Sequence, residues 1–136
     1  MNPQFASNKQ RLEHVFSESA KGNGRPFLEA LADDVRWTVM GETAWSGPYR
    51  GKETILSKLI GPLRRALESP IKTHAVRFIA EGDFVCVQAR GDNTTRSGEP
   101  YRNTYCFVFE FKDGEVCAIT EYADTALINS VLGPPA

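Results

Sequence analysis

Hydrophobic and polar residues alternate along the last third of the chain in a way that predicts three β-strands. Runs rich in β-branched and aromatic residues cover 84–92, 101–111 and 115–122, and each run is bounded by Gly, Pro or Asp. In the middle run the odd-numbered residues are mostly aromatic, whereas the even-numbered residues are mixed. Because successive side chains of a strand point to opposite faces, the odd-numbered side is predicted to face the core.

The remainder of the chain predicts helices that precede further strands. Helical spacing of apolar residues marks 7–21, 26–32 and 51–67, and Gly61-Pro62 predicts a kink or a break in the third helix. Strands are expected over 35–39 and 71–80, a loop or irregular hairpin over 41–49, and a last helix over 125–132. Helices followed by a continuous antiparallel sheet predict an α+β fold, with a small-molecule pocket where the helices leave a curved sheet uncovered.

The last turn decides where Glu121 points. A three-residue loop with Gly114 in the left-handed position of a bulge opposes Tyr105 to Glu121 and turns the Glu121 side chain inward. A two-residue Asp113-Gly114 turn would turn the same side chain outward. We favour the bulged loop, and Glu121 is therefore expected on the aromatic face.

The preceding turn places two more charged residues on that face. A two-residue loop that begins at Gly98 opposes Asp92 to Tyr105, with Arg90 one pleat step below. Adjacent strands lie ~4.8 Å apart, so the Asp92 and Glu121 carboxylates would lie roughly 10 Å apart with a phenol between them. The pattern predicts a polar cluster on an otherwise aromatic face.

Length and charge narrow the class of protein. The 136 residues predict one domain over 1–136, with loose tails at 1–6 and 133–136. A net charge of −1 gives no reason to expect nucleic acid or a membrane surface as partner. The sequence begins with neither a basic segment nor a long apolar one, which favours a cytoplasmic protein.

Cysteines and histidines do not form a recognisable ligand set. Cys86, Cys106 and Cys117 lie in predicted strands without a Cys-x-x-Cys spacing, so buried free thiols are expected. His14 and His74 are far apart in the sequence, and His74 is expected to be a packed or surface residue. We predict neither a metal nor a cofactor.

Five short motifs resemble one family of proteins. They cover 33–37, 47–53, 101–105, 113–116 and 121–125. In this order and spacing the chain resembles the SnoaL-like branch of the nuclear transport factor 2-like superfamily. The resemblance implies a cystatin-like roll, in which a cone-shaped, curved antiparallel sheet wraps around the N-terminal helices and a short C-terminal helix follows. It also implies an internal pocket and, commonly, a homodimer through the open sheet face.

The superfamily includes ketosteroid isomerases, polyketide cyclases, epoxide hydrolases and proteins without catalysis, so the fold alone does not give the function. Arg90-Gly91-Asp92 resembles the first catalytic element of limonene epoxide hydrolases, and Glu121 stands where their second acid falls. Their Tyr-x-Asn pair, on an earlier strand, has no counterpart here. Asn103 and Tyr105 lie on a different strand.

The predicted cluster suits acid–base chemistry. Asp92, paired with Arg90, would remain ionised and act as the base, whereas Glu121 among apolar neighbours would be the acid. Tyr105 and Asn103 would hold a substrate oxygen by hydrogen bonds. The alternative is a purely structural network, in which Arg90 bridges the two buried acids.

Several further residues are expected to contact a ligand. Trp37 and Phe107 would line the cavity, although a large ring is often plain core, and Trp45 is a weaker candidate. Met40 and Tyr49 would lie near the mouth, where ordinary loop contacts are an equal alternative.

On the opposite sheet face an apolar patch predicts a homodimer seam. Its expected members are Val85, Val87, Cys106 and Val108. The sequence thus favours a cofactor-free isomerase, cyclase or hydrolase that acts on a small oxygen-bearing hydrophobic molecule. A non-catalytic ligand-binding or dimerisation module is the alternative, as is an epoxide hydrolase-like enzyme built on Arg90, Asp92 and Glu121.

Overall fold

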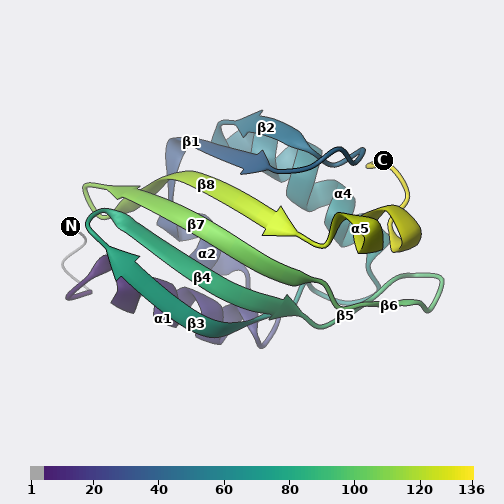
Figure 1. Ribbon diagram of the computed structural model, residues 1–136, viewed down its shortest axis with the longest axis horizontal. Helices are drawn as coiled ribbons and strands as arrows, with labels where there is room; N and C mark the ends of the chain where they lie inside the picture. The colour runs from purple at the N-terminus through teal and green to yellow at the C-terminus, as the bar shows by residue number, and fades with distance from the viewer. Residues whose placement is uncertain (1–4) are drawn as a thin grey trace.

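A computed structural model describes residues 5–136 and shows a curved sheet covered on one face by helices (Figure 1). The six-stranded sheet has the order β2-β1-β8-β7-β4-β3. Its strands are β1 (Leu31–Val39), β2 (Gly47–Arg50), β3 (Thr73–Glu81), β4 (Phe84–Gly91), β7 (Thr104–Lys112) and β8 (Glu115–Ala123). A two-stranded arm, β5 (Asn93–Thr94) and β6 (Pro100–Tyr101), extends from the same end of the sheet as the last helix.

The helices form the second layer and the C-terminal end. They are α1 (Asn8–Ser19), α2 (Arg25–Ala30), α3 (Lys52–Ile55), a π-helical turn (Leu56–Ile60), α4 (Gly61–Ala66) and α5 (Thr125–Val131). In Figure 1, α1, α2 and α4 lie behind the sheet, and α5 follows the end of β8. The predicted α+β fold with a short C-terminal helix is confirmed. Within residues 5–136, no helix has the length and apolar character needed to cross a membrane.

The sheet is mixed, not antiparallel throughout. The first strand, β1, pairs in parallel with the last strand, β8, and in antiparallel with β2. Parallel neighbours need a long connection, here most of the chain, so no turn signal in the sequence marks the pair. Successive side chains of β1 alternate between the two faces of the sheet, so Val35, Trp37 and Val39 point into the core beside β8.

The β7–β8 turn differs from its predicted form. Asp113 and Gly114 both have positive φ and form a two-residue turn, with Lys112 opposite Glu115. The extra residue lies further along β8, because Glu110 pairs with Ala118 and leaves Cys117 as a bulge. The tight turn alone would point Glu121 to the outer face, and the extra residue at Cys117 turns it back to the inner face. Glu121 therefore does face inward, opposite Phe107 instead of Tyr105.

The β4–β7 connection is longer than predicted. As a result, each side chain of β4 points to the sheet face opposite to the predicted one. The chain continues through β5 and β6 in one register, and its loop closes where the Thr95 N–H donates to Glu99 O at 2.8 Å. The Thr95 hydroxyl also accepts from the Glu99 N–H, which replaces a tight turn. Residues 95–99 separate β5 from β6, which is three residues more than the predicted two-residue loop and an odd number. Ala89 therefore pairs with Tyr105 on the inner face, and Arg90 points outward.

The helical segment after Gly51 contains a π-helical turn where a kink was predicted. Pro62 has no N–H, and its ring would crowd the carbonyl one α-helical turn earlier. Widening the helix relieves this contact, and the Gly61 N–H donates to Leu56 O. A Cβ at Gly61 would lie 2.8 Å from that oxygen, so the close approach requires glycine.

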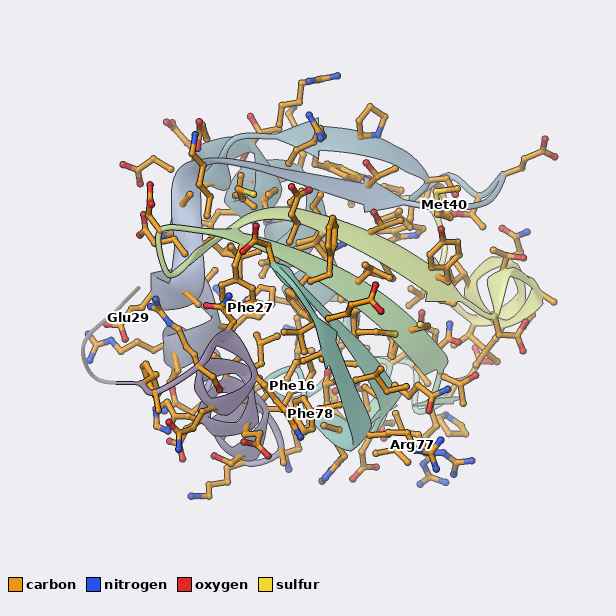
Figure 2. All side chains as sticks on the ribbon, turned by 60° about the vertical axis from the view of Figure 1, so that its left-hand side comes forward. Phe16, Phe27, Glu29, Met40, Arg77 and Phe78 are labelled. Carbon is orange, nitrogen blue, oxygen red and sulfur yellow. The ribbon has the colours of Figure 1, made fainter. Side chains whose placement is uncertain are left out.

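Aromatic rings join the helical layer to the sheet. Phe16 of α1 packs edge-on against Phe78 and Phe109, with ring centroids 6.0 Å apart in both pairs. Phe27 of α2 packs against Trp37 at 5.5 Å. Figure 2 shows Phe16 and Phe27 between the N-terminal helices and the sheet. Because rings of this size space the two layers apart, they also form walls of the internal cavity described below.

A buried arginine fixes α1 to the last hairpin. Arg11 donates one guanidinium hydrogen bond to Gly114 O at 2.7 Å and another to Glu29 O at 3.1 Å. The planar guanidinium can serve two carbonyls at once, which a lysine cannot do in the same geometry. The ends of the chain also make contacts. The Ala6 N–H donates to Gln10, and Gly133 O accepts from Trp45. Residues 1–4 of the predicted tail lie outside the described residues.

Candidate functional site

A cavity of about 570 Å³ lies between the inner face of the sheet and the helices. This volume is within the range of pockets that bind small organic molecules. Its walls are largely apolar and include Phe27, Trp37, Leu59, Leu63, Phe107 and Ile128. The sequence predicted the pocket from the layer arrangement, and the aromatic side of β7 forms part of its wall.

Glu121 is an ionisable residue in the wall of this cavity. The Trp37 indole N–H donates to its Oε1 at 3.1 Å and fixes the carboxyl from the neighbouring strand. Burial raises the Glu121 pKa from 4.5 to about 7, and the hydrogen bond from Trp37 opposes this only in part. Near neutral pH the carboxyl group therefore exists in both protonation states, as a residue that exchanges protons with a ligand must.

Two phenols accompany the carboxyl group. Tyr105 and Tyr101 both line the cavity. Burial is the main cause that raises the pKa of each, and the nearby Glu121 charge raises both further. Both phenols therefore stay protonated at neutral pH and can donate a hydrogen bond. Tyr101 was not singled out in the sequence, although it lies on the same odd-numbered side as Tyr105.

Asn103 is a structural residue and not the predicted ligand contact. Its side chain is fully buried and is not part of the cavity wall. Its Oδ1 accepts from the N–H groups of Thr104 and Asp124, at 2.8 and 3.0 Å. Its Nδ2 donates to Tyr101 Oη and Asp124 O, at 3.1 and 3.2 Å. With its donors and acceptor used in this way, Asn103 positions Tyr101 and the start of α5.

The predicted placement of Arg90 and Asp92 is wrong. Both are exposed on the outer face, because the long β5–β6 connection reverses their orientation. Asp92 lies 3.9 Å from His74 Nε2 and 3.7 Å from Arg102 Nε, in an exposed charge cluster. Arg90 therefore does not bridge buried acids. The Arg90, Asp92 and Glu121 set of the epoxide hydrolase interpretation is not assembled.

The remaining predicted contacts divide into two groups. Trp37 and Phe107 line the cavity, and so does Trp45, the weaker candidate. Tyr49 is not part of the cavity wall. Its hydroxyl donates to Trp45 O at 2.8 Å, and burial raises its pKa. Met40 is exposed at the end of β1, away from the cavity wall (Figure 2).

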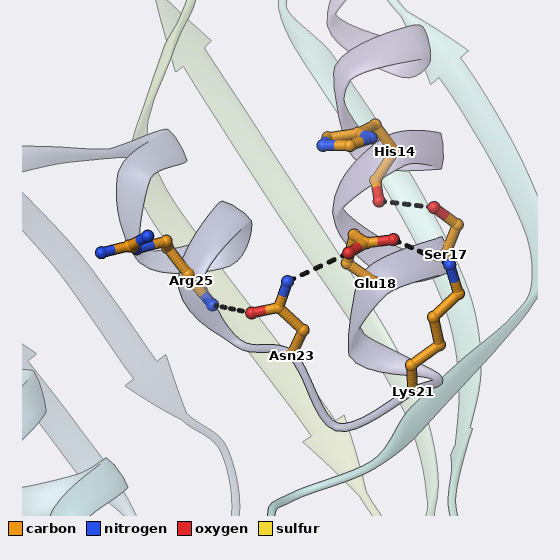
Figure 3. Close-up of polar contacts among 6 residues, drawn as sticks. All are labelled: His14, Ser17, Glu18, Lys21, Asn23 and Arg25. Carbon is orange, nitrogen blue, oxygen red and sulfur yellow. Dashed lines mark hydrogen bonds and ion pairs between the residues drawn. The ribbon is translucent and has the colours of Figure 1, made fainter.

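The rim of the cavity is formed mainly by connections between elements. Gly22 and Gly24 come from the α1–α2 connection, Arg64 from α4, residues 68–71 from the segment after α4, and Arg96 from the β5–β6 loop. The α1–α2 connection is held by side chains: Asn23 donates to Glu18 at 3.0 Å and accepts from the Arg25 N–H at 3.2 Å (Figure 3). Gly22 has a φ of 86°, which permits the sharp reversal there. The rim next to α1 is therefore built from small residues.

The cysteines are free thiols, as predicted, but they are partly buried and not fully buried as expected. Cys86 and Cys106 have sulfurs 3.3 Å apart, and burial raises the pKa of Cys86 to about 11, so the Cys86 thiol stays protonated at neutral pH. Among residues 5–136, no three His, Cys, Asp or Glu side chains group closely enough to hold a metal ion.

Comparison with known proteins gives a family and a fold. The sequence profile of the SnoaL-like domain family matches residues 12–119. An NTF2-like protein of unknown function from Burkholderia pseudomallei K96243 is 21% identical, with a TM-score of 0.78 over 93% of this chain and 99% of that one. A putative SnoaL-like polyketide cyclase from Jannaschia sp. CCS1 is 17% identical, with a TM-score of 0.75 over 100% and 98%.

A third similar structure, TerC co-crystallised with polyporic acid, is 18% identical, with a TM-score of 0.77 over 91% of this chain and 96% of that one. No curated protein matches the chain. At these identities the solved structures establish the fold, and the residues of the site must be argued from this chain.

The raised pKa of Glu121 predicts a pH-dependent stability. A carboxyl group whose pKa is higher in the folded state lowers the free energy of unfolding as the pH rises from 4.5 to about 7, because the unfolded chain releases its proton first. The shift corresponds to a destabilisation of up to about 3 kcal/mol above pH 7. We expect Glu121→Gln to unfold at higher urea concentration than the parent at about pH 8.

The same comparison at low pH provides the internal check. Below the unfolded-state pKa the parent carboxyl is neutral in both states, so the difference between Glu121→Gln and the parent should largely disappear. Asp92→Asn, which removes an exposed carboxylate, is the matched control and should show no comparable change. A constant difference across the pH range would contradict the buried, proton-binding state of Glu121.

Proposed function

Since the chain belongs to the SnoaL-like domain family, we propose that its cavity binds a small apolar molecule bearing a polar oxygen and transfers a proton on it, as isomerases and cyclases do. One observation carries this proposal: a carboxyl group with a pKa of about 7 in the wall of an otherwise largely apolar cavity. A general acid–base group works best when its pKa is near the working pH.

The proposed reaction begins at a carbon next to a carbonyl group. Ionised Glu121 removes a proton from this carbon, and the C–H electron pair moves onto the carbonyl oxygen to give an enolate. Tyr105 or Tyr101 donates a hydrogen bond to this oxygen and stabilises its charge. Where a C=C bond lies one carbon further along, Glu121 returns the proton to the far carbon of the dienolate, which is an isomerisation. Alternatively the enolate carbon attacks a second carbonyl within the ligand, the C=O electron pair moves onto its oxygen, and this alkoxide takes the proton from Glu121, which is a cyclisation. One carboxyl group therefore has both roles that the sequence divided between Asp92 and Glu121.

The Trp37 hydrogen bond has a defined part in this proposal. It holds one carboxyl oxygen of Glu121, which leaves the other free to meet the ligand. Because it stabilises the ionised form, it also keeps the Glu121 pKa from rising further. Two proteins of the same fold, a putative polyketide cyclase and one co-crystallised with polyporic acid, support a small organic ligand.

Deuterium uptake by 2-tetralone tests proton abstraction without knowledge of the natural substrate. This apolar bicyclic ketone has acidic hydrogens next to its carbonyl group, and exchange in D₂O is followed by NMR. We expect the protein to accelerate exchange, with a rate that rises with pH through an apparent pKa near 7. Glu121→Gln should lower the rate by a factor of about 100 or more.

Asp92→Asn is again the matched control, because it removes a carboxylate from the surface and not from the cavity. Its exchange rate should equal that of the parent. If 2-tetralone binds to the parent and Glu121→Gln leaves its exchange rate unchanged, the site is a binding module and proton transfer by Glu121 is excluded.

We also propose that the chain forms a homodimer through the outer face of the sheet. This face carries Ile79, Phe84 and Tyr122, each with about half of its surface exposed. Cys106 and Val108 lie on the same face as predicted, but Val85 and Val87 do not, since they are buried in the core. Large apolar side chains grouped on one sheet face favour burial against a second copy.

Charged substitutions test this interface. Ile79→Glu and Phe84→Glu would bury carboxylates at the proposed interface, so we expect dimeric parent and monomeric double variant in sedimentation velocity. Lys9→Glu, which places a carboxylate on the exposed side of α1 behind the sheet, should leave the parent's mass unchanged. A monomeric parent, or a double variant with the parent's mass, would exclude the proposed interface.

A further inference from the structure

The ionisable residues of the cavity wall form two groups on different elements. One group is Glu121 on β8 with the two phenols at the start of β7 and on β6. The other lies at the rim and consists of Arg64 on α4, Glu68 just after it, and Arg96 in the β5–β6 loop. Between them the wall is mainly aliphatic and aromatic. A ligand that fills this cavity therefore meets a carboxyl group and phenols from the sheet and β6, and guanidinium groups from α4 and the β5–β6 loop.

The two rim arginines are available to a ligand. Both are exposed, and among residues 5–136 neither forms an ion pair. The Arg96 Nε–H donates to Arg65 O at 2.6 Å, which anchors the guanidinium by one edge. Arg64 has one terminal nitrogen beside Gly24 of the α1–α2 connection. Arg65, by contrast, hydrogen-bonds to Ala136 O at the C-terminus.

The sheet gives a length scale for the cavity. Thr73 on β3 and Glu121 on β8 both line it. β8 and β3 are three strand spacings apart in the order β8-β7-β4-β3, which corresponds to about 14 Å across a flat sheet. A ligand that spans this distance has the length of two fused rings with a short side chain.

We propose that the ligand is an amphipathic carboxylic acid whose carboxylate lies between Arg64 and Arg96 and whose ring system reaches Glu121. With Glu68 included, the rim carries one net positive charge, which suits a monoanion better than a phosphate dianion. The opposite orientation would place two carboxyl groups together in the desolvated part of the cavity, where like charges repel. This inference rests on the proposed small-molecule function of the cavity and names the class of ligand.

A matched pair of ligands tests the inference by binding alone. The probes are 4-(2-naphthyl)butanoate and its primary amide, which have the same shape and differ in charge. In calorimetric titrations at about pH 8 and low salt, we expect the acid to bind about tenfold tighter than the amide. This preference should fall as salt screens the exposed arginines.

Substitutions locate the carboxylate. In the double variant Arg64→Gln and Arg96→Gln, affinity for the acid should fall about tenfold, while affinity for the amide stays within about twofold of the parent. Arg50→Gln, at an exposed arginine on β2, is the matched control and should change neither. If loss of the Arg96 hydrogen bond perturbs folding, the single variant Arg64→Gln replaces the double variant. No hydrogen bond from the Arg64 side chain is present among residues 5–136, so this substitution breaks none.

Two results would overturn the inference. Equal affinities of the acid and the amide would show that the rim does not recognise a carboxylate. An acid whose affinity rises in Glu121→Gln but is unchanged in the arginine variants would show the reverse orientation. Neither result bears on deuterium exchange of neutral 2-tetralone, so failure of this inference is distinguishable from failure of proton transfer.

Discussion

The structure depends on the burial of one carboxyl group against an indole. Glu121 lies in a largely apolar wall, and its hydrogen bond from Trp37 offsets only part of the desolvation that raises its pKa to about 7. The folded protein thus holds a group that is more stable neutral than ionised. The fold therefore loses stability as the pH rises from 4.5 to about 7, because the unfolded chain releases this proton before the folded protein does. We infer that this destabilisation persists because the same property lets Glu121 take up and return a proton.

Three features of the chain bring that group into place. The bulge at Cys117 determines which β8 side chains point inward, so that Glu121 faces the cavity. Parallel pairing with β1 brings Trp37 alongside, and the two strands are also joined where the Met40 N–H donates to Glu121 O. Large aromatic side chains on α1, α2 and β7 hold the helices and the sheet apart, and they do not fill all of the space between the two layers. The cavity is a consequence of this spacing, and the helices that cover it also supply its rim.

Much of this arrangement is readable from the sequence, and the failures have physical causes. Alternation gave the inner face of β7 correctly, because side chains on a strand alternate whatever its partners are. The orientation of Glu121 was right although its turn was wrong, since moving the extra residue from the loop to Cys117 leaves the parity unchanged. Arg90 and Asp92 were placed on the wrong face because the connection after β4 has three more loop residues than a tight turn.

Other parts of the site leave no local trace in the sequence. The β1–β8 pair joins segments about eighty residues apart, so the contact between Trp37 and Glu121 could not be inferred from turns. Asn103 was taken for a ligand contact because it shares a face with aromatic residues, but backbone groups near α5 use its amide. The two rim arginines come from separate connections whose approach only the fold reveals.

The most direct test of the central claim is the titration of the Glu121 carboxyl carbon by NMR. Protein labelled with ¹³C at the glutamate side-chain carboxyl would be titrated, and comparison with Glu121→Gln would assign the resonance. The account predicts a midpoint near pH 7 for this resonance. A midpoint near 4.5, the ordinary value for glutamate, would show that the carboxyl group is solvated and would contradict the account.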